Sequence, residues 1–285
     1  GGKGGVMMGK KWLIGLIMLF LIVGNVYTTS YAEEAFDKGV DYVDKGMYDQ
    51  AIIEFTKAIE INPDDADAYF ERGFTYIDKG NYDQAISDFS KVIEINPDDA
   101  DAYFERGLAY AKKGNYDQAI PDFNKAIEIN PDDADAYYNR GFTYTDKGNY
   151  DQAISDFSKV IEINPDDADA YYERGFAYAK KGNYDQAISD YSTAIEINPD
   201  DADAYYERGL AYAKKGNYDQ AIPDYSKAIE INPDDADAYF ERGLAYFYKQ
   251  EYDKTWENVH KVEALGIKVH PDFLEALKKA SGREK

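Results

Sequence analysis

Prolines recur at a fixed interval of 34 residues along most of this chain. Six of the nine prolines stand at positions 63, 97, 131, 165, 199 and 233. Seven glycines, from Gly39 to Gly243, and six more, from Gly46 to Gly216, keep the same step. A period of this length indicates an array in which each repeat is one supersecondary unit, so it constrains the fold more than any other feature.

Units that begin at the alanine after each Asp-Asp pair divide the array into seven repeats. The predicted units are 32–65, 66–99, 100–133, 134–167, 168–201, 202–235 and 236–269. In the unit 202–235, Tyr205, Gly209 and Tyr212 stand at i, i+4 and i+7, on one face of a first helix. A second helix carries Ala221, Tyr225 and Ala228 on one face. Neither apolar face is wide enough for a stable isolated helix, so stacking on the neighbouring unit must complete the core.

The segments between the two helical patterns contain helix start and stop signals. A glycine follows the first helix, and in the unit 202–235 it is Gly216. Glycine can adopt the left-handed φ that often ends a helix. An Asn-Pro pair ends the second helix. Asp234 and Asp235 come next and are candidates for the N-cap of the following helix.

This repeat resembles the tetratricopeptide repeat (TPR) family. The residues that match its pattern of aromatic, Gly, Tyr, Ala, aromatic and Pro are Tyr205, Gly209, Tyr212, Ala221, Tyr225 and Pro233. The same types recur in units 2 to 5, with Val92 and Val160 in place of the late alanine, whereas Arg208 replaces a leucine of the family. The seventh unit departs furthest, with Thr255 and Val259 at two of these places. The resemblance covers about 32–269 and implies an all-α fold, an α-solenoid superhelix of helix-turn-helix repeats.

A short helix is expected after the seventh repeat. Phe273, Leu274 and Leu277 form its apolar stripe, and two lysines stand in its last turn. Repeat arrays need a terminal cap to cover their apolar end. The tail 270–285 is therefore predicted to hold a C-terminal capping helix.

Composition argues against catalysis, cofactors and nucleic acid. The chain has no cysteine, its two histidines are His260 and His270, and its glycine spacing fits no phosphate-binding loop. A net charge of −23 is unfavourable for binding phosphate backbones. The Asp-rich turns lack the spacing of an EF-hand and are interpreted as helix caps and a solvated rim, although weak divalent binding stays an alternative. No catalytic residue, cofactor or metal site is predicted.

The resemblance implies that places 2, 5 and 9 of each first helix, counted from the start of the unit, face a concave groove. Place 5 is aromatic in every unit, place 9 is apolar, and place 2 is aspartate in six units. The candidate groove residues are Asp67, Phe70, Phe74, Asp101, Phe104, Leu108, Asp135, Tyr138, Asn139, Phe142, Asp169, Tyr172, Phe176, Asp203, Tyr206 and Leu210. Packing of these rings between neighbouring repeats is the alternative to binding.

The family's carboxylate clamp does not fit this groove. This clamp requires Lys and Asn at places 5 and 9 of one repeat, Asn at place 6 of the next repeat, and Lys and Arg at places 2 and 6 of the third. Aligned on Asn139, the other places hold Phe104, Leu108, Asp169 and Glu173. Acids stand where bases are required, so this ligand mode is excluded.

The N-terminal residues match a secretory signal. Lys10 and Lys11 precede an apolar run over 12–23, and small residues stand at −3 and −1 before the bond after Ala32. As a helix this run spans about 18 Å, against a bilayer core of about 30 Å. A cleaved signal peptide over 1–32 and a repeat array over 33–269 are therefore favoured over an uncleaved membrane anchor. In either case the lysines predict repeats outside the cytoplasm, in the periplasm or the extracellular space.

Two hypotheses for function follow. The first is a non-catalytic scaffold that binds a peptide or protein segment with basic and apolar residues in the groove. The second is a structural or self-associating array without a separate client, or an assembly factor held at the membrane by its N-terminal segment.

Overall fold

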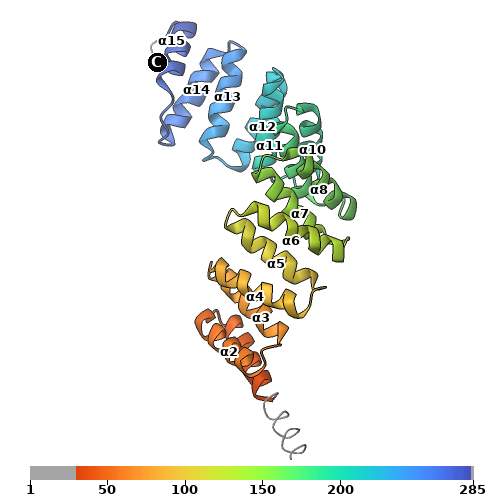
Figure 1. Ribbon diagram of the computed structural model, residues 1–285. Helices are drawn as coiled ribbons and strands as arrows, with labels where there is room; N and C mark the ends of the chain where they lie inside the picture. The colour runs from red at the N-terminus through yellow and green to blue at the C-terminus, as the bar shows by residue number, and fades with distance from the viewer. Residues whose placement is uncertain (1–29, 284–285) are drawn as a thin grey trace, which may run out of the picture. The chain divides into compact units, whose positions relative to one another are not determined.

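The computed structural model describes residues 30–283, and the predicted signal peptide lies outside the described residues except at its last positions. The described residues are helical from 30 to 44 and contain no strand. Contacts divide the chain into two compact units, Gly1–Pro131 and Asp132–Lys285, and each is described by itself. Within each unit, helices follow one another as antiparallel pairs (Figure 1).

The helices after the first segment keep nearly constant lengths. The first unit contains α2 (Tyr48–Ile61), α3 (Ala66–Asp78), α4 (Tyr82–Ile95), α5 (Ala100–Lys112) and α6 (Tyr116–Ile129). The second contains α7 (Ala134–Asp146), α8 (Tyr150–Ile163), α9 (Ala168–Lys180), α10 (Tyr184–Ile197), α11 (Ala202–Lys214), α12 (Tyr218–Ile231), α13 (Ala236–Tyr248), α14 (Tyr252–Ala264) and α15 (Pro271–Ser281). The predicted all-α fold of helix-turn-helix repeats is confirmed.

An N-cap residue marks the start of each first helix, and a left-handed glycine forms the turn between the two helices of a repeat. The second aspartate of the Asp-Asp pair is the N-cap: Asp235 Oδ1 accepts from the backbone N–H of Ala238 at 3.0 Å. Gly216 has φ 77° in the turn between α11 and α12. Its backbone N–H donates to the carbonyl of Ala213 at 2.9 Å, so this carbonyl at the end of α11 has a hydrogen-bond donor. Gln250 takes this left-handed place in the seventh repeat with φ 62°.

In the first six repeats, the core contains a ring of the second helix packed against a glycine of the first helix. A Cβ added to Gly209 would lie 2.8 Å from Cε1 of Tyr225, which is closer than real Cβ atoms approach. Tyr225 and Ala221 are fully buried. Glycine is therefore required here for the close approach of two helices rather than for a special backbone conformation.

Arginine at place 7, where the family has leucine, forms a buried ion pair with the second helix. Arg174 donates from Nε and Nη2 to the carboxylate of Asp190, both at 2.7 Å, and from Nη1 to Ser158 Oγ of the preceding repeat at 3.1 Å. The same pair joins Arg72 to Asp88, Arg106 to Asp122, Arg140 to Asp156 and Arg208 to Asp224. One side chain therefore links both helices of a repeat and the repeat before it.

The predicted capping helix is present as α15. Its Leu277 is fully buried with Trp256, Val259 and Val262 of α14, and Phe273 packs against this cluster. The indole N–H of Trp256 donates to Ser281 Oγ at 3.2 Å. Among the described residues, no helix has the length and apolar character that crossing a membrane requires.

Candidate functional site

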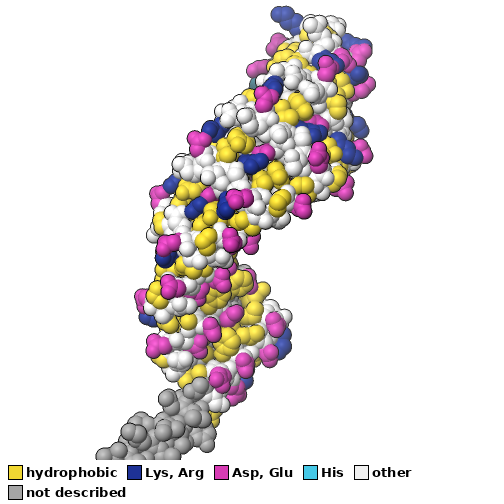
Figure 2. All heavy atoms as spheres, turned by 90° about the vertical axis from the view of Figure 1, so that its right-hand side faces the viewer, with side chains coloured by type: hydrophobic (Ala, Val, Ile, Leu, Met, Phe, Trp, Pro, Cys, Tyr) yellow, Lys and Arg dark blue, Asp and Glu magenta, His cyan; other side chains and the backbone are white. Residues whose placement is uncertain are grey.

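The first helices of successive repeats lie side by side within each unit, which brings equivalent places into rows. Contacts join α3 with α5 in the first unit, and α7 with α9, α9 with α11, and α11 with α13 in the second. The resulting surface, made of places 2, 5, 6 and 9 of these helices, is called the first-helix face below. Figure 2 shows apolar and acidic side chains interspersed on the sides of the units that it displays.

The predicted aspartates at place 2 are all exposed. In the first unit these are Asp67 and Asp101, and in the second Asp135, Asp169 and Asp203. Each stands in the first turn of its helix, where a negative charge opposes the helix dipole. They form the solvated acidic edge that the sequence predicts.

The predicted rings at place 5 are half-buried, so they contact the core and remain partly accessible. Each lies edge-on or tilted against the buried ring of its own repeat. The centroid distances are 5.4 Å for Phe70–Phe89, 5.9 Å for Phe104–Phe123, 5.5 Å for Tyr138–Phe157, 5.6 Å for Tyr172–Tyr191 and 5.9 Å for Tyr206–Tyr225. Each ring therefore contacts the core of its own repeat on one side, and its other side remains accessible.

In the second unit these rings lie beside acids of the following repeat. Burial raises the pKa of Tyr138 strongly, and the negative charges of Glu173 and Asp169 add to the shift. Tyr172 has the same relation to Glu207 and Asp203. The predicted Tyr and Asp residues are thus brought together between repeats, as a binding surface requires.

Place 9 supplies the more accessible apolar side chains. Phe142 is 46% exposed and Phe74 is 40% exposed, whereas Leu108, Phe176 and Leu210 are half-buried. The ammonium group of Lys180 lies 4.5 Å from the ring centroid of Phe176 and partly covers it. Phe142 and Phe74 are therefore the anchors most open to a partner in their units.

A row of glutamates at place 6 was missed by the sequence analysis, which considered only Glu173, as a mismatch to a clamp. Burial raises the pKa of Glu105 and of Glu173 to about 7, and the nearby charges of Asp101 and Asp169 add to the effect. The recurrence of glutamate between two groove-facing places was the signal that could have identified them.

Charges on the preceding repeat divide these glutamates into two kinds. Asp146 raises the pKa of Glu173 further, whereas the positive charge of Lys180 opposes the shift at Glu207. Lys214 has the same effect on Glu241. Among the place-6 glutamates of the second unit, an acid of the preceding repeat therefore adds to the raised pKa of Glu173, whereas a lysine opposes the shift at Glu207 and Glu241.

Asn139, predicted as a groove residue, stands at place 6 of the fourth repeat. Its amide donates to the backbone carbonyl of Asp135 at 2.9 Å, in its own helix. The side chain is half-buried. In the first helix of the second unit it puts a neutral group at the place where the following repeats have glutamate.

The Asp-rich turns and His270 have structural roles. The second aspartate of each turn caps a helix, and no group of three or more His, Cys, Asp or Glu in residues 30–283 is arranged to hold a metal ion. His270 is the N-cap of α15, where its Nδ1 accepts from the backbone N–H of Asp272 at 3.3 Å.

Stacked helix pairs with a row of rings and acids along their first helices define an α-helical repeat protein. Models described as "TPR repeat" match residues 39–80, 73–114, 143–182 and 177–216. Models described as "Tetratricopeptide repeat" match 100–133, 202–235, 123–155 and 225–257. The chain belongs to the tetratricopeptide repeat family.

Solved structures of other repeat proteins are similar to this chain. YrrB, described as a TPR protein with an unusual peptide-binding site, is 31% identical with a TM-score of 0.58, over 65% of this chain and 95% of YrrB. MamA protein is 31% identical with a TM-score of 0.58, over 61% of this chain and 94% of that one. A tetratricopeptide repeat protein from Parabacteroides merdae shares the fold at 23% identity and a TM-score of 0.64, over 89% of this chain and all of the other. None of the curated proteins compared with the chain matches it. Family and neighbours together make this chain a protein-interaction scaffold.

Proposed function

We propose that the chain is a non-catalytic scaffold that binds a peptide or protein segment with basic and apolar side chains on its first-helix face. The observation that carries the proposal is the placing of partly exposed rings next to acids of the following repeat. Tyr138 lies beside Asp169 and Glu173, and Asp146 adds a further negative charge.

The apolar part of the partner would contact the side chains at places 5 and 9. Phe142 exposes nearly half of its surface, while the neighbouring Tyr138 is held in place by Phe157. A ring fixed by its own core loses little conformational entropy when it is covered, which favours its use as an anchor.

The basic part of the partner would compensate the half-buried carboxylates. A lysine or arginine beside Glu173 would form a charge-assisted hydrogen bond where solvent screening is reduced. The exposed aspartates at place 2 would add little affinity each, but their field would speed the approach of a basic segment at low salt.

Variants of Phe142 and Glu173 test this proposal on a peptide selected from a displayed random library. Selected peptides should be enriched in Lys or Arg together with aromatic or branched apolar residues. Phe142→Ala should weaken binding about five-fold or more, because truncation of an interface anchor costs more than about 1 kcal/mol. Glu173→Gln should weaken it about ten-fold, since hydrogen bonds to charged groups contribute about 1.5–3 kcal/mol. Titration calorimetry measures both.

Glu207→Gln is the matched control, because Lys180 already compensates that carboxylate. It should change affinity little. The affinity of the parent protein should also rise as pH increases through 7, where the carboxyl of Glu173, with its pKa of about 7, becomes ionised. Selection of acidic peptides, or equal losses for Glu173→Gln and Glu207→Gln, would refute the proposal.

We also propose that the repeats act outside the cytoplasm, on the basis of the signal-like pattern over 1–32. The exported protein should then begin at Glu33, and its intact mass after purification from a secreting host measures this. Retention of the N-terminal segment in a membrane fraction would favour an anchored scaffold instead.

A further inference from the structure

The seventh repeat lacks the Arg–Asp ion pair that repeats 2 to 6 share. Place 23 holds Asn258 instead of aspartate, and its Oδ1 accepts from Nε of Arg242 at 3.0 Å. Nη1 of Arg242 donates to Ser226 Oγ at 3.1 Å. Within residues 30–283, Arg242 forms no ion pair, and its Nη2 has no acceptor where the equivalent Nη2 of Arg208 binds Asp224 at 2.7 Å. A half-buried guanidinium thus keeps an uncompensated charge.

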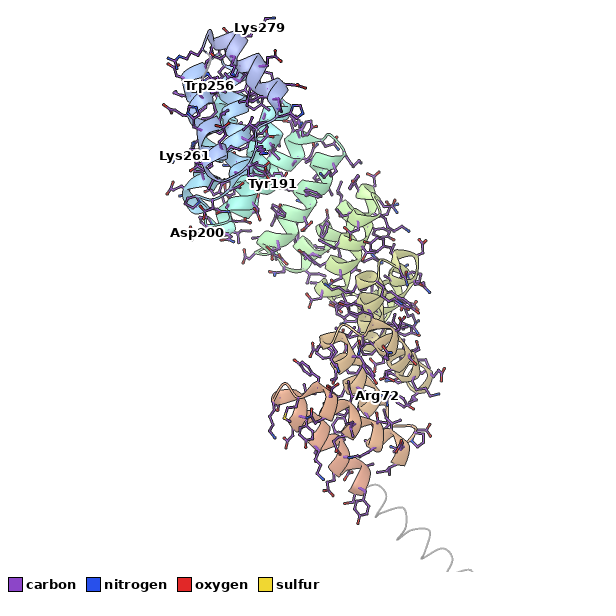
Figure 3. All side chains as sticks on the ribbon, turned by 90° about the vertical axis from the view of Figure 1, so that its left-hand side faces the viewer. Arg72, Tyr191, Asp200, Trp256, Lys261 and Lys279 are labelled. Carbon is purple, nitrogen blue, oxygen red and sulfur yellow. The ribbon has the colours of Figure 1, made fainter. Side chains whose placement is uncertain are left out.

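A cavity of 580 Å³ adjoins this guanidinium. It is lined by Tyr239 and Arg242 of α13 and by Glu257, Asn258, His260 and Lys261 of α14. Lys261 lies on the exposed side of α14 (Figure 3). These residues stand at places 4 and 7 of the first helix and on the second helix, so the cavity is separate from the first-helix face.

The equivalent surface of the preceding repeat is covered by the next first helix. On α12, Ser226 accepts from Arg242, and Ala228 packs with Ala238 and Tyr239 of α13. The helix that follows α14 is α15, and its Phe273 packs elsewhere, against Phe240 and Phe247. His260 occupies the place of Ser226, so this surface of α14 no longer offers a hydroxyl to an incoming arginine.

Charge indicates what the cavity would accept. Arg242 and Lys261 are positive, and Glu257 is the single acid among the lining residues. This local balance is opposite to the net charge of −23 of the whole chain. In the sixth repeat Asp224 accepts from both Nε and Nη2 of Arg208, whereas in the seventh Asn258 accepts only from Nε of Arg242, so Nη2 is the group that an anion would bind.

We propose that the cavity between α13 and α14 is a binding site for an oxyanion, a carboxylate or a phosphate group. The anion accepts from Nη2 of Arg242 in place of the missing aspartate, and Lys261 supplies a second positive charge. The cavity volume is within the range of small-molecule pockets, roughly 300–1,000 Å³. The site is therefore large enough for a small organic acid or phosphate ester as well as for the free ion.

Titration calorimetry of the full chain with inorganic phosphate and, separately, with acetate tests the site and distinguishes the two chemistries. The parent protein should bind at least one of them saturably, with a dissociation constant in the millimolar range or below. Asn258→Asp restores the carboxylate of the other repeats and should weaken binding about ten-fold or more, because the anion loses its charge-assisted bond. Lys261→Gln, a surface change, should weaken it in the same direction.

Asp224→Asn is the matched control. It removes the same carboxylate in the sixth repeat, where α13 covers the surface, and should therefore create no additional anion site. Absence of saturable binding of either anion by the parent protein would overturn the proposal, as would unchanged affinity in Asn258→Asp. A second, equal site in Asp224→Asn would show that the cavity is not required.

Discussion

Replacing Asp190 by alanine should lower the free energy of unfolding by about 3–5 kcal/mol. Asp190 is 6% exposed and receives two hydrogen bonds from Arg174, whose pKa is raised by this contact. Without the carboxylate, the guanidinium stays mostly buried between two helices and keeps an uncompensated charge. Urea denaturation followed by circular dichroism measures the change.

A double variant tests the charges of this ion pair separately from the packing of the two side chains. Arg174→Met with Asp190→Leu removes both charges and replaces them with apolar groups, so its stability should lie near that of the parent protein or above it. The stability of Asp190→Asn should lie between that of Asp190→Ala and that of the double variant, because the chain already has asparagine at the equivalent place, Asn258. A loss below about 1 kcal/mol in Asp190→Ala would mean that the pair behaves as a solvent-exposed one.

Removal of residues 271–285 should have the second large effect. The deletion uncovers Trp256, Val259 and Val262, which α15 buries with Leu277 and Phe273. Burial of large apolar side chains contributes about 1.5–3 kcal/mol each, so the seventh repeat should lose about 5 kcal/mol and expose an apolar end that promotes aggregation. Thermal melts and multi-angle light scattering report both outcomes.

Deletion of the interior repeat 168–201 is the matched comparison. It joins α8 to α11, which begins with the same Ala-Asp-Ala-Tyr residues as the α9 that it replaces. Stacking should be restored, with a small loss in stability from one interface fewer. If this variant aggregates while the protein without its cap remains a monomer with an unchanged melt, the nearest-neighbour description of the array is wrong.

The proposed binding depends on how charges are distributed along the first helices. Glu173 faces Asp146, whereas Glu207 faces Lys180, although both glutamates stand at the same place of their repeats. Nearly identical repeats therefore differ in the charges beside their place-6 glutamates, and under the proposed function these differences would give subsites with different preferences. A partner that carries one basic residue at the right spacing would bind the array in a defined register.

The sequence by itself determined the helix pairs, their caps and turns, and the rows of places 2, 5 and 9. These follow from local rules: the 34-residue period, Asp235 as an N-cap, Gly216 with φ 77°, and apolar residues spaced for one helix face. The C-terminal cap was predicted in the same way, because its apolar stripe lies within one helix. Whether the rings face a partner or the core was left open, and the structure shows that one side of each ring packs on the core of its own repeat.

Only the tertiary structure decided which side chains meet across helices. Arg174 and Asp190 are 16 residues apart and pair because two helices bring places 7 and 23 together. The raised pKa of Glu173 depends on burial and on Asp146, a residue of the preceding repeat. The uncompensated Arg242 becomes visible only when its partner, Asn258, is located in space. Periodicity fixes what lies along one helix, whereas electrostatic partners depend on distances between helices that no local pattern contains.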